Sequence, residues 1–481
     1  YGSNLLWMSL AYARADRRRE GHVPDPDFVP QATPVSVTIQ LPLYNEPLVA
    51  ERLIDACARI DHPPRHLEIQ VLDDSTDSTS NVVTARVAAW QRRGINIVHV
   101  RRPHRDGFKA GALQNGFRIA RGDYIAIFDA DFVPKPDFLR RILAEFTDDD
   151  IGLVQSRWSH LNSDSSILTK MQAMGLDTHF AIEQRVRELT GCFITFNGTA
   201  GVWRRECIED AGGWQGDTIA EDLDLSYRAQ MKGWRFRYVG DLEVPAELPA
   251  STSALRSQQF RWAKGSTETA LKLLGPLWRS AHPLRVKLQG TIHMTAHAAF
   301  LFILLALFLH APLLVAKSVG EGPGPAYFGW MALGLAGFVG FSLAQLYAQR
   351  DLYVDWGRRL RLFPAFMAGS IGLSLSNARA VLEALAGKRS AFVRTPKFNA
   401  EEISSRSSTP PIAYAELAIF VYSLAGLAAV VSIGEWAAIP FQALFVAGFG
   451  IITIANFAPS LLKSKSGGAS LADNAGRVLT P

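Results

Sequence analysis

Pairs of carboxylates follow two apolar stretches of this sequence, and their spacing suits the binding of a metal ion or a phosphate-bearing ligand. Asp129 and Asp131 are one residue apart, and Asp73 and Asp74 are adjacent. Two carboxylates with a one-residue gap can share a divalent cation such as magnesium, which also binds diphosphate oxygens. A carboxylate of the second pair could hold a ribose or a base edge, or could cap the next helix. Solvated turns are the alternative for both pairs.

Three more carboxylates, Glu221, Asp222 and Asp224, stand where a helix is expected to begin. Acidic residues in a first turn favour the helix dipole, so this placement could be structural alone. A carboxylate can also act as a general base that removes a proton from a hydroxyl near a metal-bound diphosphate. The residues themselves leave both interpretations open.

Gln258, Arg261 and Trp262 combine an amide, a guanidinium and an indole within five positions. A guanidinium pairs well with phosphate oxygens. An indole face offers a flat apolar platform for a sugar ring, although Trp262 taken alone could equally be a packing residue. Together with the carboxylates, these side chains would suit a nucleotide-sugar ligand.

Elements that could position these residues alternate regularly in the first half of the chain. Strands are expected at 35–43, 67–72, 95–100 and 124–128, and helices at 47–60, 79–93 and 109–120. This alternation predicts an α/β domain with a mostly parallel sheet covered on both faces. Ligands of such sheets lie at the carboxyl ends of the strands, which is where both acidic pairs fall.

Composition limits the class of protein without settling it. The chain has 481 residues, 48% hydrophobic and 20% charged, with a mean hydropathy of +0.06. These values exclude a disordered chain, a collagen and a disulfide scaffold. The net charge of +5 is carried by basic residues that punctuate apolar runs, which does not suggest nucleic-acid binding. Cys57, Cys192 and Cys207 have no CxxC spacing and are expected to be free thiols.

The second half of the chain changes character and predicts membrane spans. Four stretches without Asp, Glu, Lys or Arg are long enough to cross a bilayer: 288–316, 322–349, 417–434 and 436–462. Residues 1–12 are apolar and precede four arginines, so they are expected to be the end of a further membrane helix. The segment 253–278 is amphipathic, and it could lie on the membrane surface or pack against the α/β domain.

Basic residues on both sides of the shorter apolar stretch 362–378 bear on topology. Segments 350–361 and 379–416 are both rich in Arg and Lys, and such segments stay on the cytoplasmic side. We therefore expect 362–378 to lie at the interface or to be re-entrant, with a tilted true span as the alternative. The α/β domain would share the cytoplasmic side of a multi-pass inner (cell) membrane protein.

The order of these motifs, with a membrane part behind them, resembles the family 2 glycosyltransferases. The resemblance is to the membrane synthases of the cellulose synthase superfamily, and especially to the cellulose-synthase-like mannan and glucan synthases and their bacterial relatives. The stretches that carry it are LPLYNE at 41–46, RDGFKAGAL at 105–113, QSRW at 155–158, HFAIEQ at 179–184 and FNGTAG at 196–201.

The resemblance implies a GT-A type nucleotide-sugar-binding domain and a role for each matching residue. Asp222 would be the catalytic base of an inverting transfer, and Asp129 and Asp131 would hold Mg²⁺ or Mn²⁺. The implied donor-binding residues are Tyr44, Glu46, Asp74, Lys109, Asp129, Asp131 and Arg261, and the acceptor-binding residues are Glu221, Gln258 and Trp262. Ala220 stands where cellulose synthases have threonine, which puts one neighbouring hydroxyl contact in doubt.

A further implied element is a gating loop at 392–397, with Thr395 and Lys397, which would close over bound nucleotide. The alternative for this stretch is a basic juxtamembrane loop attracted to anionic lipid. The expected domains are a membrane-helix end at 1–13, a GT-A domain at 30–250, interfacial amphipathic helices at 251–285, two transmembrane helices at 286–349, a cytoplasmic or interfacial segment at 350–412, two transmembrane helices at 413–463 and a cytoplasmic tail at 464–481.

The predicted activity is a processive transfer of hexose from UDP-glucose or GDP-mannose to a β-linked polysaccharide, which the spans would export. The expected partners are the nucleotide-sugar donor, a polysaccharide or lipid acceptor, the lipid bilayer and an export partner protein, with no nucleic acid. One alternative is a glycolipid synthase that adds a single β-glucosyl group to diacylglycerol. Another is a transporter with a regulatory nucleotide-binding domain, whose repeats and intramembrane charges are not evident in the sequence.

Overall fold

A seven-stranded sheet forms the centre of the N-terminal half in the computed structural model, which describes residues 1–19, 35–322, 324–331, 334–388 and 411–457. The strand order is β3-β2-β1-β4-β6-β5-β7. The strands are β1 Val37–Leu43, β2 Leu67–Asp73, β3 Ile97–Arg101, β4 Tyr124–Ile127, β5 Ile151–His160, β6 Gly201–Arg204 and β7 Arg235–Ala246. Strand β6 is antiparallel to both of its neighbours, and the other paired strands of the sheet are parallel. The predicted mostly parallel sheet is therefore confirmed.

The helices of this half cover both faces of the sheet. They are α2 Pro47–Ala58, η1 Pro64–His66, α3 Thr79–Gln91, α4 Phe108–Ile119, α5 Phe138–Leu143, α6 Ile167–Thr178, η2 His179–Gln184, α7 Arg185–Leu189, α8 Arg205–Asp210 and α9 Glu221–Met231. The four strands and three helices expected before residue 130 are all present, with ends within two residues of those expected.

Two apolar cores follow from the alternation of side chains along each strand. Ile39 packs with α2, α3 and α5 on one face, whereas Leu72 packs with α4, α8 and α9 on the other. Cys57 and Cys207 lie in these two cores, and together with Cys192 they are buried free thiols, as expected. Because both faces are covered, a ligand must enter at an edge of the sheet.

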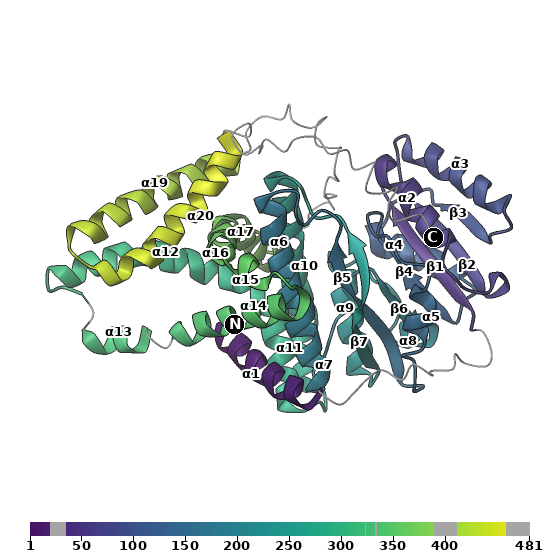
Figure 1. The fold of residues 1–481 in the computed structure, drawn as a ribbon, viewed down its shortest axis with the longest axis horizontal. Helices are drawn as coiled ribbons and strands as arrows, with labels where there is room; N and C mark the ends of the chain where they lie inside the picture. Colours follow the sequence, from purple (N-terminus) through teal and green to yellow (C-terminus); the bar gives the residue numbers. More distant parts are fainter. Residues whose placement is uncertain (20–34, 323, 332–333, 389–410, 458–481) are drawn as a thin grey trace.

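Helices dominate the rest of the chain. They are α1 Gly2–Arg19, α10 Thr252–Arg279, α11 Leu284–Thr295, η3 Ala296–Ala298, α12 Ala299–Ser318, α13 Pro325–Met331, α14 Gly334–Leu352, α15 Trp356–Leu360, α16 Phe363–Gly372, α17 Ser374–Leu385, α19 Pro411–Ser432, η4 Trp436–Ala438 and α20 Ile439–Phe457. Figure 1 shows α12, α19 and α20 at one end of the molecule, the sheet at the other, and α10 between them.

Three helical stretches of the described residues are long and apolar enough to cross a membrane: Leu284–Ser318, Pro411–Ser432 and Trp436–Phe457. They coincide with three of the four expected spans and make the chain a membrane protein with several spans. The fourth expected span, 322–349, corresponds to α13 and α14, and positions 323 and 332–333 lie outside the described residues.

The shorter apolar stretch 362–378 is interrupted at Leu373, where α16 ends and α17 is about to begin. Helix α16 has ten residues, too few to cross a bilayer as one helix. Helix α1 lies against α14, where Gly340 permits a very close approach, since a Cβ there would come within 2.4 Å of the Leu6 nitrogen. The membrane placement of these elements and the domain limits stay predictions.

Candidate active site

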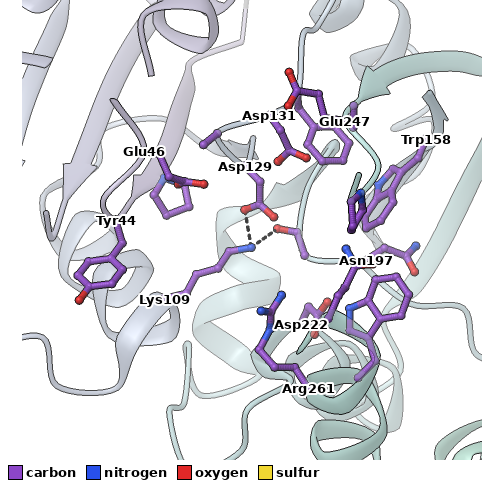
Figure 2. A pocket seen from close by; sticks show the side chains of 18 of the residues that line it. Tyr44, Glu46, Lys109, Asp129, Asp131, Trp158, Asn197, Asp222, Glu247 and Arg261 are labelled. Atoms are coloured by element: carbon purple, nitrogen blue, oxygen red, sulfur yellow. Dashed lines mark hydrogen bonds and ion pairs between the residues drawn. The ribbon is translucent and has the colours of Figure 1, made fainter. Parts of the chain in front are cut away.

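One pocket gathers the chemistry-bearing residues at the carboxyl ends of β1, β2 and β4. These strands are adjacent in the sheet, and β1 and β2 end together because Leu43 and Asp73 are partners in register. Every expected site residue that the structure describes lines this pocket: Tyr44, Glu46, Asp74, Lys109, Asp129, Asp131, Glu221, Asp222, Gln258, Arg261 and Trp262. Figure 2 labels seven of them: Tyr44, Glu46, Lys109, Asp129, Asp131, Asp222 and Arg261. Thr395 and Lys397 lie outside the described residues.

The end of the pocket next to β1 and β2 offers a flat cationic surface beside a fixed carboxylate. The guanidinium carbon of Arg105 lies 3.4 Å from the centre of the Tyr44 ring. Arg102 donates hydrogen bonds of 2.7 and 2.6 Å to the two oxygens of Asp74, and Glu46 is buried nearby in the lining. A planar base could stack on such a surface, because guanidinium groups and aromatic rings both stack face to face.

The two carboxylates of the Asp73-Asp74 turn have different surroundings. Asp73 accepts hydrogen bonds from the Ser75 backbone N–H at 2.8 Å and from the Ser80 hydroxyl at 2.6 Å, and His99 lies 2.9 Å away. Burial alone would raise the pKa of Asp73, but the hydrogen bonds from His99, Ser80 and Ser75 outweigh burial and lower it. Asp73 therefore organises the turn, while Asp74 faces the pocket.

Lys109 joins the two halves of the pocket. Its ammonium lies 2.6 Å from Asp129 and 3.6 Å from Glu221, and it donates a 2.9 Å hydrogen bond to the Gly198 carbonyl. Figure 2 shows the Lys109 side chain directed at Asp129. Burial alone would lower the pKa of Lys109, but the charges of Asp129 and Glu221 outweigh it and raise that pKa. Lys109 is thus a fixed positive charge at the centre of the site.

Asp222 lies in the first turn of α9, next to Glu221. Burial, and then the neighbouring Glu221 carboxylate, raise the pKa of Asp222 to about 7, and burial also raises the pKa of Glu221. Asp222 Oδ1 accepts a 2.8 Å hydrogen bond from the Leu223 backbone N–H, which fixes the carboxylate. Asp224, in contrast, is fully buried and pairs with Arg228 on the same helix. The pKa of Asp222 therefore lies near neutral pH, beside a second carboxyl, Glu221, whose pKa is also raised.

A tight loop before β6 brings backbone against Asp222. Gly198 has a φ of +81°, and a Cβ there would lie 3.1 Å from Asp222 Oδ2 and 3.3 Å from the Lys109 ammonium nitrogen. The Asn197 amide oxygen lies 3.0 Å from His179 Nε2. His179 begins η2, a π-helical turn of a kind that is frequent at functional sites. Glycine at 198 leaves the space in which Asp222 and Lys109 sit.

Asp129 and Asp131 fit the requirements of a hard divalent cation. Both line the pocket from the turn after β4, and the Asp129 backbone N–H is held by the Thr199 hydroxyl at 2.9 Å. Among the described residues no group of three His, Cys, Asp or Glu side chains could hold a metal by itself. Two carboxylates suffice for magnesium or manganese when diphosphate oxygens and water supply the other ligands.

Helix α10 supplies the wall of the pocket that faces the membrane part, through Gln258, Arg261 and Trp262. Burial lowers the pKa of Arg261 to about 10, against the opposing charges of Asp129, Glu221 and Glu46. Arg261 therefore keeps its positive charge at neutral pH. Its charge acts on the same carboxylates as Lys109, so the site concentrates cations where a diphosphate would lie.

Several lining residues were not singled out from the sequence. They are Arg105, Trp158, His160, Asn197, Gly198 and Glu247. Arg105, Trp158, Asn197 and Gly198 lie inside the motif stretches quoted above, so the motifs could have identified them as site residues. His160 and Glu247 gave no local signal, because their proximity depends on the parallel pairing of β5 with β7, in which His160 is the partner of Ala246.

Comparisons with known proteins agree with this geometry. Residues 34–265 match the profile of the family described as "Glycosyltransferase like family 2". Glucomannan 4-beta-mannosyltransferase 1 of Oryza sativa subsp. japonica is 42% identical over 295 residues, which is 60% of this chain and 56% of the relative. Glucomannan 4-beta-mannosyltransferase 7 of Arabidopsis thaliana is 45% identical over 249 residues, or 51% and 45% of the two chains. The chain thus spans about half the length of these curated relatives.

A solved structure supports the fold. The mannosyltransferase PcManGT from Pyrobaculum calidifontis, in complex with GDP-Man and Mn²⁺, superposes with a TM-score of 0.50 over 81% of this chain and 100% of that chain. The sequence identity is 21%, so the likeness concerns the fold alone. The sheet domain has the GT-A type fold that the sequence predicted.

Proposed function

We propose that the chain is a member of glycosyltransferase family 2, whose profile matches residues 34–265, and that it is an inverting, processive hexosyltransferase that adds mannosyl units from GDP-mannose to a 4-linked β-mannan or glucomannan. The choice of mannose is supported by the names of the plant relatives, which are glucomannan 4-beta-mannosyltransferases. The observation that carries the proposal is the position of Asp222, a half-buried carboxylate with a raised pKa, in one pocket with Lys109, Asp129 and Arg261.

Asp222 accepts the proton that the reaction releases. A hydroxyl of the acceptor sugar attacks C1 of the donor hexose, the bond from C1 to the diphosphate oxygen breaks, and the hydroxyl proton moves to the Asp222 carboxylate. The nucleoside diphosphate leaves with the bonding electrons, and a single attack of this kind inverts the configuration at C1. A pKa of about 7 suits this role, because a general base works best near the operating pH.

Lys109 and Arg261 stabilise the charge that develops on the leaving diphosphate. Both side chains are cationic at neutral pH, and both act on Asp129 and Glu221. Preorganised charges in a water-poor pocket are effective there because little reorganisation is needed during the reaction. Asp129 and Asp131 would hold Mg²⁺ or Mn²⁺, which when bound neutralises part of the diphosphate charge.

The acceptor would enter from the side of α10. Trp262 and Gln258 line the pocket from that helix, and Glu221 lines it beside Asp222. The nucleotide would bind at Tyr44, Glu46 and Asp74, and Thr395 and Lys397 would close over it. The chain would lie in the inner (cell) membrane, with the pocket on the cytoplasmic side. The spans, together with an export partner protein, would pass the polymer outward.

The test uses membranes that contain the chain, supplied separately with labelled GDP-mannose and UDP-glucose. GDP-mannose is expected to give a water-insoluble polymer that a β-mannanase digests. Asp222→Asn membranes serve as the control for incorporation by other enzymes. A chloroform-soluble product that carries one sugar would favour the glycolipid synthase instead, and incorporation from UDP-glucose alone would refute the assignment of the donor.

A further inference from the structure

A buried ionic cluster connects α10 to the two C-terminal spans. Arg256 of α10 donates hydrogen bonds of 3.1 and 2.8 Å to the two carboxylate oxygens of Glu416 in α19. It also donates a 3.2 Å hydrogen bond to Asn456 of α20, whose amide donates at 2.7 Å to Glu416. Glu416 is fully buried, within a helix apolar enough to cross a membrane. An ionisable residue in such a position is more often functional than structural.

Arg256 and the pocket residues of α10 lie on opposite faces of that helix. A helix turns by about 100° per residue, so Gln258, Arg261 and Trp262 are rotated by about 200°, 140° and 240° from Arg256. The three side chains therefore cluster around the face opposite Arg256, and this is the face that lines the pocket. A contact that fixes Arg256 fixes both the rotation and the height of the residues that would bind the acceptor.

A second charged contact acts on the same helix. Lys264 of α10 is fully buried, lies 3.9 Å from Glu383 of α17 and donates to the Lys388 carbonyl. Apolar packing is also present, since Leu255 of α10 forms a cluster with Leu373 and with Ile452 of α20. The membrane-facing side of α10 thus has apolar contacts as well as two ionic ones.

Stability alone does not account for the Arg256–Glu416 pair. Replacing both members of a buried ion pair by apolar residues of similar volume is often neutral or stabilising, whereas removing one member is strongly destabilising. The feature that apolar side chains would not reproduce is the fixed register given by the directed contacts of Arg256 Nη2 with Glu416 and Asn456, and by the hydrogen bond from the Asn456 amide to Glu416. We propose, resting on the function proposed above, that Arg256 and Glu416 are positioning residues that hold the acceptor-binding face of α10 in register with the donor pocket and the C-terminal spans.

The test uses a double variant that carries both Arg256→Met and Glu416→Met, so that neither charge is left unpaired. This double variant is compared with the unmodified chain. The double variant is expected to keep its Tm and its KM for GDP-mannose. Its turnover should fall by about tenfold to a hundredfold, because small misplacements of reacting groups cost that much, and its product should be shorter. Arg256→Lys, which keeps a donor and the charge, should recover part of the loss.

The matched control is the exposed pair of Lys317 and Glu435, which are 2.6 Å apart and join α12 to the turn before η4. Lys317→Met with Glu435→Met should leave turnover and product length unchanged. A double variant of Arg256 and Glu416 with the turnover and product length of the unmodified chain would overturn the proposal. So would a loss of affinity for GDP-mannose equal to the loss of turnover.

A second measurement needs no activity and separates this inference from the proposed function. Spin labels at Ser253→Cys in the first turn of α10 and at the exposed Ile119→Cys of α4 report the distance between α10 and the sheet domain. The double variant should shift or broaden that distance distribution, even if the chain used another donor. An unchanged distribution would contradict the positioning role, whereas failure to transfer mannose by the unmodified chain would contradict only the proposed function.

Discussion

Asp222→Asn is expected to remove most of the transfer activity while leaving the shape of the pocket intact. The amide oxygen of asparagine can still accept the 2.8 Å hydrogen bond that the Leu223 backbone N–H donates to Asp222 Oδ1. The amide cannot take a proton from the acceptor hydroxyl. Loss of a general base typically lowers kcat by about 10²- to 10⁴-fold, so we expect a fall in that range with a nearly unchanged KM for the donor.

The assignment of Asp222 as the base also predicts how strongly the transfer rate depends on pH. With a pKa of about 7, half of Asp222 is ionised at pH 7. At pH 5 about 1% is ionised, so the rate should fall by about 50-fold between these values. An ordinary aspartate pKa of about 3.9 would leave most of the carboxylate ionised at pH 5, and the rate would hardly change. The acidic limb of the profile should disappear in Asp222→Asn.

Folding stability supplies an independent check on the raised pKa of Asp222. Because folding raises the pKa, the unfolded chain loses this proton at a lower pH than the folded chain does. Ionisation therefore lowers the free energy of unfolding progressively as the pH rises from the unfolded value to about 7, and fully above it. Asp222→Asn removes this penalty, so it should raise Tm at pH 8 and have little effect on Tm at pH 4.

The assay is transfer of labelled mannose from pH 5 to pH 8 at donor concentrations below and above KM, because the pH profile of kcat/KM reports the pKa of the free enzyme. Tm is measured on the same preparations. Asp217→Asn is the matched control, since Asp217 is an exposed carboxylate that pairs with Lys272 outside the pocket lining. It should keep full activity and the same pH profile. Near-normal kcat in Asp222→Asn, or a flat profile between pH 5 and pH 7, would refute the assignment of the base.

Three further changes test the rest of the site. Lys109→Met removes a charge that lowers the pKa of Asp222, so the acidic limb of kcat/KM should move above pH 7, and an unmoved limb would show that the two groups do not interact. Gly198→Ala adds a Cβ 3.1 Å from Asp222 Oδ2 at a φ of +81°, so we expect a lower kcat together with a loss of about 1 kcal/mol in unfolding free energy, read from denaturant titration. A chelator should abolish transfer and Mg²⁺ or Mn²⁺ restore it, with Asp131→Asn requiring more metal, and full activity in the chelator would exclude a metal requirement.

The first half of the sheet was predictable because its signals are local. Strands β1, β2 and β4 are short, mainly apolar runs; β2 ends on Asp73, and polar or acidic residues follow β1 and β4 within two positions. The helices between them have ordinary lengths. The carboxyl ends of adjacent parallel strands meet at one edge, so Asp74, Asp129 and Asp131 could be placed together before any coordinates. The residue types drew attention to the carboxylates of α9 and to Gln258, Arg261 and Trp262 of α10, and the family resemblance then assigned their roles. Of these candidates all but Asp224 line the pocket.

The other features of the fold and the site could not be predicted, because they depend on contacts between residues far apart in the sequence. Strands β5 and β7 pair in parallel although more than 80 residues separate their partners, and this pairing brings Glu247 beside His160. The Arg256–Glu416 contact joins residues 160 positions apart, and Glu416 stands just outside the uncharged stretch 417–434. The raised pKa of Asp222 also depends on burial, which the order of residues does not reveal.

The configuration of the newly formed glycosidic bond tests the central claim most directly. The chain, purified in lipid nanodiscs, would be supplied with GDP-mannose labelled with ¹³C at C1 and with a short mannan acceptor. The C1–H1 coupling of the product would then be measured by NMR. A β-configured bond to O4 of the acceptor is the result that a single displacement assisted by Asp222 predicts. An α-configured product, or release of free mannose without transfer, would contradict it.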